Sequence, residues 1–330
     1  MSAPGAGAGR ERLERLRATL PLWLAVAAGV LLAVGVFGDL PQVLALLGRF
    51  RWELLPAILG LTLLNYLLRL LKWGYYLRLI GAGSVPPLES AGIFFSGLAM
   101  TITPGKVGEW LKSYLLSQRH GVPFAVSAPI ILAERLTDGV AMLLLALGGL
   151  FVYGYGRELI VLIALAAVGL VLFTQVRALP LALLARLEGM PVVGSRIHHL
   201  HAFYESAHRL FRPAALLLAI GLGLISWGGE CVAFYLVLVG LGVAPAPELL
   251  LQAAFVLAVS TLVGSVSMLP GGLAVAEGSI AGLLLLLGIT DQPAVAAAAT
   301  LLIRFATLWF GVLVGIAALT AISRREVSKG

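Results

Sequence analysis

The sequence predicts an all-α integral membrane protein, a polytopic helical bundle with two inverted repeats that each contain a re-entrant helical hairpin broken at a Pro-Gly pair. Composition is the first observation, because 60% of the 330 residues are hydrophobic and only 12% are charged, whereas soluble domains carry about 25% charge. The other two observations are long apolar runs and two runs that stop at Pro-Gly pairs. These features exclude a soluble enzyme, and the single cysteine, Cys231, excludes a disulfide framework.

One transmembrane domain is expected over residues 20–322, between a cytoplasmic N-terminal segment (1–19) and a cytoplasmic tail (323–330). An apolar run of about 20 residues is long enough to cross a bilayer as a helix. The runs predicted to cross are Leu20–Gly38, Leu54–Leu71, Ala125–Val152, Leu159–Val176, Pro213–Gly242 and Pro293–Ile322.

Basic residues predict the orientation in the membrane. With the N-terminus in the cytoplasm, 18 of the 23 Lys and Arg residues fall on cytoplasmic segments, as the positive-inside rule requires. At the end of the second run, Arg69, Lys72 and Arg78 are expected to reach the headgroup layer with their long side chains. The prediction is a multi-pass protein of the cell membrane, plasma or inner, with both termini in the cytoplasm.

Two apolar segments are too short or too broken for simple spans. Ser90–Gly105 has 16 uncharged residues, about 24 Å of helix against a hydrocarbon core of about 30 Å. It stops at Pro104-Gly105 and turns into charged sequence, which is typical of a re-entrant hairpin. The second segment runs from Leu249 through Pro270-Gly271-Gly272 to Thr290, and its first half is long enough to span.

The two broken segments look like copies of one unit, over residues 89–152 and 249–322. Each has a Pro-Gly break, then a glutamate, then a span with an arginine, and proline and arginine are 31 residues apart in one copy and 34 in the other. An odd number of crossings separates the copies, so they enter the membrane from opposite sides. Inverted repeats with broken helices are typical of transporters. The alternative is that the Pro-Gly pairs are ordinary helix breaks.

Charged residues inside the predicted spans need partners or a wet cavity, since each costs at least about 2.5 to 3.5 kcal/mol at the bilayer centre. Arg135 and Asp138 are three residues apart, so they are predicted to pair within their own helix. Glu230 has no cation near it in sequence, and Arg135 and Arg304 are the candidate partners. Structural ion pairing between helices is one interpretation of this set.

The functional interpretation is a central polar cavity for an anionic headgroup. Guanidinium groups bind phosphate through two parallel hydrogen bonds, and broken helices add free backbone N–H groups. In this interpretation Lys106, Arg135 and Arg304 attract the anion, while Glu109, Glu230 and Glu277 neutralise them in the empty site. The predicted site residues are Lys106, Glu109, Arg135, Asp138, Glu230, Glu277 and Arg304, with the breaks at Pro104, Gly105, Pro270, Gly271 and Gly272.

The segment 178–212 is predicted to be cytoplasmic and amphipathic, with a helix over Ile197–Phe211 that lies on the inner headgroup layer. His198, His201, Glu205 and His208 share one face of that helix, but a solvated histidine face needs no metal, and none is predicted. The chain has no nucleotide-binding loop, nucleophile elbow or zinc motif. No cofactor and no nucleic-acid partner are therefore expected.

Three stretches carry a resemblance to a known family. The run Thr101-Ile102-Thr103-Pro104-Gly105-Lys106-Val107-Gly108-Glu109, the run Ala133–Asp138, and Ser267–Gly272 with Glu277 resemble the lysylphosphatidylglycerol synthase transmembrane-region family. In that family the region forms the flippase half of the multiple peptide resistance factor, which moves aminoacylated phosphatidylglycerol between leaflets. The resemblance implies that Arg135 and Glu230 match polar positions of the flippase half. It gives no counterpart of the aminoacyl-transferase domain, so synthesis of aminoacyl lipid is not expected.

The sequence thus favours a membrane transporter of the lipid flippase type, which is not an enzyme and translocates an anionic lipid with a phosphate headgroup through a central cavity. Its expected partner is a membrane phospholipid or another phosphate-bearing lipid. The alternative is a non-catalytic scaffold or accessory subunit for a lipid-modifying enzyme or glycosyltransferase. A partner enzyme or a homo-oligomer is compatible with both.

Overall fold

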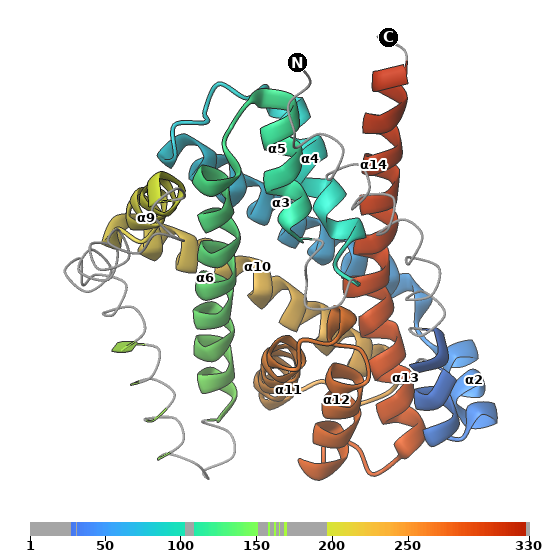
Figure 1. Ribbon diagram of the computed structural model, residues 1–330. Coiled ribbons are helices and arrows are strands. Elements are labelled where there is room, and N and C mark those ends of the chain that lie inside the picture. Colours follow the sequence, from blue (N-terminus) through green and yellow to red (C-terminus); the bar gives the residue numbers. More distant parts are fainter. Residues whose placement is uncertain are drawn as a thin grey trace.

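A computed structural model describes residues 28–30, 32–102, 109–150, 158, 162, 165, 168–169 and 197–327. All regular structure in these ranges is helical (Figure 1). The first half contains α2 (Leu40–Arg49), the short η1 (Trp52–Leu54), α3 (Leu55–Leu79), α4 (Pro87–Ala99), α5 (Leu111–His120) and α6 (Phe124–Leu150). The second half contains α9 (Ile197–Leu210), α10 (Pro213–Gly240), α11 (Pro247–Val266), η4 (Pro270–Gly272), α12 (Val275–Leu286), α13 (Pro293–Arg304), η5 (Phe305–Trp309) and α14 (Phe310–Val327).

Four helices are long and apolar enough to cross a membrane, namely Trp52–Leu79, Pro213–Gly240, Pro247–Val266 and Pro293–Ala321. A fifth span results if Ala28–Phe37 and Leu40–Arg49, which meet at 96°, are one broken span. The all-helical, multi-pass membrane architecture predicted from the sequence is therefore confirmed. The predictions for residues 1–19, for Leu159–Val176 and for the break at Pro104 and Gly105 lie on residues outside the described ranges or only partly within them.

Proline marks the start of most of these helices. Pro56, Pro87, Pro213, Pro247 and Pro293 each occupy one of the first two helical positions, where the missing N–H costs no hydrogen bond and the fixed φ suits a helix. Away from the interior the helices expose apolar side chains, such as Leu217 (72%) and Ile225 (60%) of α10. Such surfaces suit a hydrocarbon environment, since lipid tails are as apolar as leucine.

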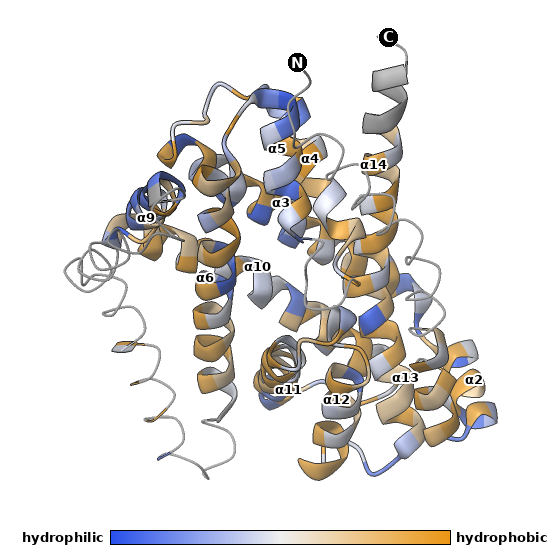
Figure 2. Ribbon diagram, in the orientation of Figure 1, coloured by the Kyte–Doolittle hydropathy of each residue, from blue (hydrophilic) through white to orange (hydrophobic). Residues whose placement is uncertain are grey.

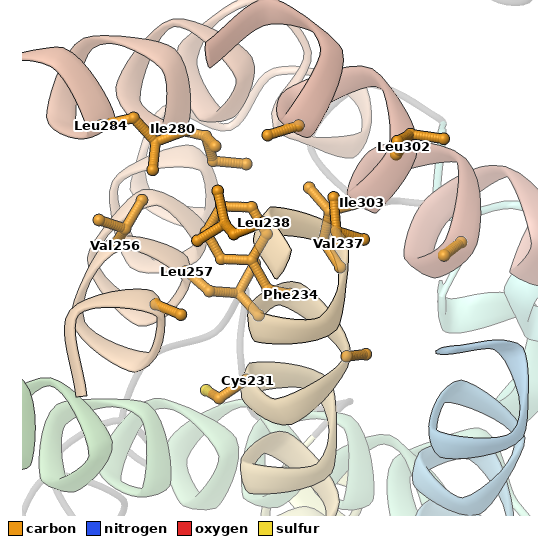
Figure 3. Close-up of a cluster of buried hydrophobic side chains, with 14 of the residues drawn as sticks. Cys231, Phe234, Val237, Leu238, Val256, Leu257, Ile280, Leu284, Leu302 and Ile303 are labelled. Carbon is orange, nitrogen blue, oxygen red and sulfur yellow. The ribbon is translucent and has the colours of Figure 1, made fainter. Parts of the chain in front are cut away.

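The largest apolar cluster lies where α10, α11, α12 and α13 meet (Figure 3). Phe234 and Leu238 of α10 are fully buried, and they face Val256 of α11, Ile280 of α12 and Ile303 of α13. Because this cluster packs four helices of the second half against one another, it fixes the relative positions of the helices that carry the polar residues of that half.

The two broken segments pack on each other's long helices. We refer to α4 and α5 as the first hairpin and to α11 and α12 as the second hairpin; within each, the two helices contact one another. The first hairpin lies against α14 through α4, and the second lies against α6 through α11 (Figure 1). Glycine permits both approaches: a Cβ at Gly149 of α6 would lie 2.5 Å from the Leu251 carbonyl oxygen, and one at Gly315 of α14 would lie 2.8 Å from the Leu98 carbonyl carbon.

Gly315→Ala is expected to lower the free energy of unfolding by about 1 to 3 kcal/mol, because the added methyl meets the backbone of α4 and the two helices must separate. Thermal unfolding in detergent micelles measures the effect. Gly60→Ala in α3 is the matched control, since a Cβ there meets nothing within 4 Å. Equal melting temperatures for the two variants would contradict the close contact between α4 and α14.

One predicted amphipathic segment has protein contacts that the sequence did not indicate. The helix predicted over Ile197–Phe211 exists as α9, and it packs against α6, α3 and α10; its place on the inner headgroup layer stays a prediction. Leu210 is fully buried in this contact. Protein therefore covers part of the apolar face of α9, while Leu200 remains exposed; amphipathic periodicity alone does not distinguish burial against protein from burial in a membrane surface.

Candidate functional site

The broken tip of the second hairpin meets the end of α4 inside the molecule. The second hairpin is interrupted after Val266, and Gly271 (φ 59°) and Gly272 (φ 67°) adopt left-handed conformations that suit glycine. The Gly271 N–H donates a hydrogen bond of 3.1 Å to the Thr101 carbonyl oxygen, just beyond the end of α4. The break predicted at Pro270-Gly271-Gly272 is confirmed, and it contacts the first hairpin directly.

Beside this contact lies a cavity of about 130 Å³. That volume suits a small polar group and not the acyl chains of a lipid. Three arginines from three helices face it: Arg69 of α3, Arg135 of α6 and Arg304 of α13. The other polar lining residues are Tyr66, Thr101, Trp227, Glu230, Thr261, Ser265 and Thr307. Figure 2 shows hydrophilic residues interrupting the otherwise apolar ribbons of α6 and α10 partway along their lengths.

Arg135 pairs with the first hairpin. Its Nε donates to Glu109 Oε2 at 2.7 Å and its Nη2 donates to Glu109 Oε1, a bidentate ion pair. The pairing of Arg135 with Asp138 within α6, predicted from their spacing, is therefore wrong. An i, i+3 pair on one helix gains little, whereas Glu109 offers both oxygens to the guanidinium fork. The Arg135 side chain remains 39% exposed, so it is still accessible from the cavity.

Arg304 pairs with the second hairpin in a similar way. Its Nε donates to Glu277 Oε1 at 2.6 Å, and its Nη2 donates to the Gly271 carbonyl oxygen at 2.7 Å. Glu277 is completely buried. Arg304 thus holds both the start of α12 and the broken tip of the hairpin. In both halves, a glutamate of the hairpin segment pairs with an arginine on the following long helix.

Arg69 and Lys72 were predicted to reach the headgroup layer, and that prediction is wrong. Lys72 is 1% exposed, and its Nζ donates to Asp138 Oδ1 of α6. Arg69 Nε lies 3.8 Å from Asp138 Oδ2, and its guanidinium lies 5.9 Å from the centre of the Trp227 ring. The reason is that α3 continues to Leu79, well beyond the predicted end at Leu71, so these cations lie within the helix rather than at its end. Asp138 itself is not among the residues that line the cavity.

A further buried ion pair joins the first hairpin to α6. Lys112 Nζ of α5 donates to Glu134 Oε2 at 2.5 Å and lies 4.8 Å from the centre of the Trp73 ring. Sequence reasoning missed this pair, although a signal was present. Glu134 and Arg135 are adjacent on α6, and their partners Lys112 and Glu109 are three residues apart around the start of α5; in both cases the acid precedes the base along the chain.

Glu230 lies in the cavity wall without an ion-pair partner. It is 3% exposed on α10, and none of the ion pairs within 4.0 Å found in the described ranges includes it. The predicted pairing with Arg135 or Arg304 is therefore not made. Its charged surroundings are Arg69, Asp138 and Arg304. Lys106, Pro104 and Gly105 are outside the described residues. Within the described part, no three His, Cys, Asp or Glu side chains form a group that would hold a metal ion.

A π-helical turn follows Arg304 directly. Residues 305–309 take this wider form between α13 and α14, and such turns often occur at functional sites. The Tyr66 hydroxyl of α3 donates to the Thr307 carbonyl oxygen at 2.8 Å. Gly311 makes room for it, since a Cβ there would lie 2.5 Å from the Tyr66 hydroxyl oxygen. Tyr66 therefore fixes the turn that positions Arg304.

Tyr66→Phe is expected to speed amide hydrogen exchange in residues 305–311 and to cost about 1 kcal/mol of stability, because the Thr307 carbonyl loses its hydroxyl donor. Hydrogen–deuterium exchange with mass spectrometry measures the change. Tyr75→Phe is the control, since it removes a hydroxyl from the same helix outside the cavity lining. Unchanged exchange in Tyr66→Phe would show that the turn is stable without this bond.

Comparison with protein families assigns nearly all of the helical region. The family model described as "Lysylphosphatidylglycerol synthase TM region" matches residues 22–315, which include every helix from α2 to α13 and the first third of α14. No curated protein matched the chain. The matched region contains both hairpins, the cavity and all the buried ion pairs described above.

Proposed function

Because the chain belongs to the lysylphosphatidylglycerol synthase TM region family, which is associated with lipid modification and translocation, we propose that it is a flippase-type transporter that moves an anionic lipid between leaflets. The lipid's phosphate headgroup enters the cavity between the hairpins, and its acyl chains stay in the hydrocarbon outside. The protein acts by binding and conformational change, not as an enzyme. Its partner is a membrane phospholipid or another lipid with a phosphate group.

One observation carries this proposal: three arginines from three separate helices converge on a single cavity inside a helical membrane domain. Charged residues within membrane spans are costly and mark the paths of substrates. Arg69, Arg135 and Arg304 outnumber the one carboxylate, Glu230, among the lining residues, so an entering anion meets guanidinium donors on three sides. Guanidinium groups bind phosphate with two parallel hydrogen bonds, a geometry that a lysine does not offer.

We also infer that the two halves are inverted repeats. Each half has a long helix (α3 or α10), a helical hairpin, and a second long helix whose arginine pairs with a glutamate of the hairpin segment. Each hairpin packs on the long helix of the other half. This reciprocal packing supports two equivalent gates around one central site, the arrangement by which inverted repeats give alternating access. The excess of Lys and Arg on one set of loops supports cytoplasmic termini.

The mechanism that follows is an exchange of ion-pair partners. In the empty site Arg135 holds Glu109 of the first hairpin, and Arg304 holds Glu277 and the Gly271 carbonyl of the second. A phosphate that binds an arginine competes with these contacts and loosens the hairpin that they hold. Each arginine therefore links headgroup binding to the release of one gate, so that the differential contacts of the ligand drive the change.

Reconstitution tests the proposal. The full chain is placed in phosphatidylcholine vesicles that contain a trace of phosphatidylglycerol with a fluorescent label on one acyl chain. Dithionite then bleaches the label in the outer leaflet. We expect dithionite to bleach more of the label than the outer leaflet holds at the start, and to do so faster than in protein-free vesicles. Identically labelled phosphatidylcholine should move more slowly. A rate equal to that of protein-free vesicles for both lipids would refute the proposal, and equal acceleration of both would refute selectivity for anions.

A further inference from the structure

The buried charges of the central site balance one another in the structure described. Four cations each have a carboxylate partner of their own: Arg135 with Glu109, Arg304 with Glu277, Lys72 with Asp138, and Lys112 with Glu134. Arg69 shares Asp138 with Lys72, at 3.8 Å, so Arg69 is the fifth cation and Glu230 the fifth acid. The described charges within the helix interiors around the cavity therefore sum to zero when all are ionised. A phosphodiester that enters this site adds one negative charge that no described residue offsets.

Glu230 is the carboxylate best placed to remove that excess. The other four acids are each held by a cation, whereas Glu230 has no ion pair within 4.0 Å and lines the cavity that the phosphate would enter. It is 3% exposed, so little water solvates its charge. An anion in the same cavity repels the carboxylate and draws the guanidinium groups toward itself. Both effects favour the protonated form of Glu230.

The groups that face Glu230 are consistent with this role. From α3 come Tyr66 and Arg69, from α6 Arg135 and Asp138, and from α13 Arg304. The part of α11 that lines the cavity has no titratable side chain, only hydroxyls such as that of Thr261. The remaining neighbours of α10, namely α9 and η1, pack at its two ends. The positive charges of Arg69 and Arg304 stabilise the ionised carboxylate of Glu230. An anion bound to these two arginines offsets their positive charge and so removes that stabilisation.

We propose that Glu230 binds a proton together with the anionic lipid, so that headgroup and proton cross as a neutral pair. This inference rests on the proposed function and adds a coupling ion to it. One carboxylate oxygen of Glu230 takes a proton from the aqueous side on which the headgroup enters. It releases the proton on the opposite side after the headgroup leaves. Linkage makes the effect reciprocal: the anion strengthens proton binding as much as the proton strengthens anion binding.

Calorimetry on the full chain in detergent tests the linkage without transport. Dihexanoyl-phosphatidylglycerol, a short-chain soluble lipid, is titrated in at several values between about pH 6 and 9, where an ordinary carboxylate stays ionised. Each titration is repeated in two buffers with different enthalpies of ionisation. The native chain is expected to take up about one proton per bound lipid in part of this range. Glu230→Gln is expected to bind the lipid with almost no proton uptake and with pH-independent affinity.

A matched control separates Glu230 from other acids. Glu248→Gln alters an exposed carboxylate at the start of α11, and proton uptake should match that of the native chain. Lipid binding without proton uptake at every pH overturns the coupling and leaves the proposed function intact, as does uptake that persists in Glu230→Gln. If the native chain neither binds the short-chain lipid nor moves labelled lipid in vesicles, the proposed function fails and the coupling fails with it.

Discussion

Replacement of Lys72 by methionine is expected to lower the free energy of unfolding by about 3 to 5 kcal/mol, the cost of leaving one partner of a buried ion pair without the other. Lys72 is 1% exposed and donates to Asp138, which is itself buried. Methionine fills a similar volume but carries no charge, so Asp138 keeps only the longer contact with Arg69 at 3.8 Å. Thermal or denaturant-induced unfolding in detergent micelles measures the loss.

A second variant shows whether the unpaired carboxylate causes that loss. Lys72→Met combined with Asp138→Asn removes both charges of the pair, and part of the lost stability should return. Arg78→Met, on the same helix but exposed, should unfold like the native chain. If Lys72→Met were as stable as Arg78→Met, Lys72 would not be buried as the structure has it, and the corrected position of the end of α3 would be in doubt.

Arg304→Lys is expected to slow translocation of anionic lipid about 10-fold while changing stability much less. Lysine keeps the positive charge next to the buried Glu277, so no carboxylate is left unpaired. It loses the fork that lets Arg304 bind Glu277 and the Gly271 carbonyl together. A single ammonium group serves one of these partners at a time and cannot grip a phosphate with two parallel bonds.

The vesicle assay with labelled phosphatidylglycerol measures this effect, and thermal unfolding of the same preparation measures folding. Arg78→Lys makes the same chemical change on an exposed surface and should leave the rate unchanged. A native rate in Arg304→Lys would mean that positive charge alone suffices at this position. The exchange of bidentate partners would then not be the step by which the second hairpin is released.

The sequence predicted the helical membrane class, the break at Pro270-Gly271-Gly272 and the presence of Arg135, Glu230 and Arg304 at one polar centre, because each depends on local composition. It did not predict the positions of Arg69 and Lys72. A cation near the end of an apolar run is usually at the membrane surface, and only the continuation of α3 to Leu79 shows otherwise. That continuation depends on packing against α10, which hydropathy does not record.

The sequence also did not predict which charged residues form ion pairs with one another. Spacing showed that Arg135 and Asp138 could meet on one helix, but Arg135 binds Glu109 and Asp138 binds Lys72, residues from different elements. The π-helical turn after Arg304 left no mark that we detected in the apolar pattern of Pro293–Ile322. The turn is recognised only in the structure, where the Tyr66 hydroxyl of α3 donates a hydrogen bond to the Thr307 carbonyl oxygen. Interhelical geometry decides these features, and sequence distance does not.

The hydrogen bond between the Gly271 N–H and the Thr101 carbonyl joins main-chain atoms only. Every amino acid supplies a carbonyl at position 101, and every one except proline supplies an N–H at position 271. Side chains around this hydrogen bond can therefore change, and the chemistry of the cavity can change with them, while the hydrogen bond itself is kept. The left-handed φ at Gly271 is the one local restriction on its composition. This contact between the two hairpins therefore does not depend on which side chains line the cavity.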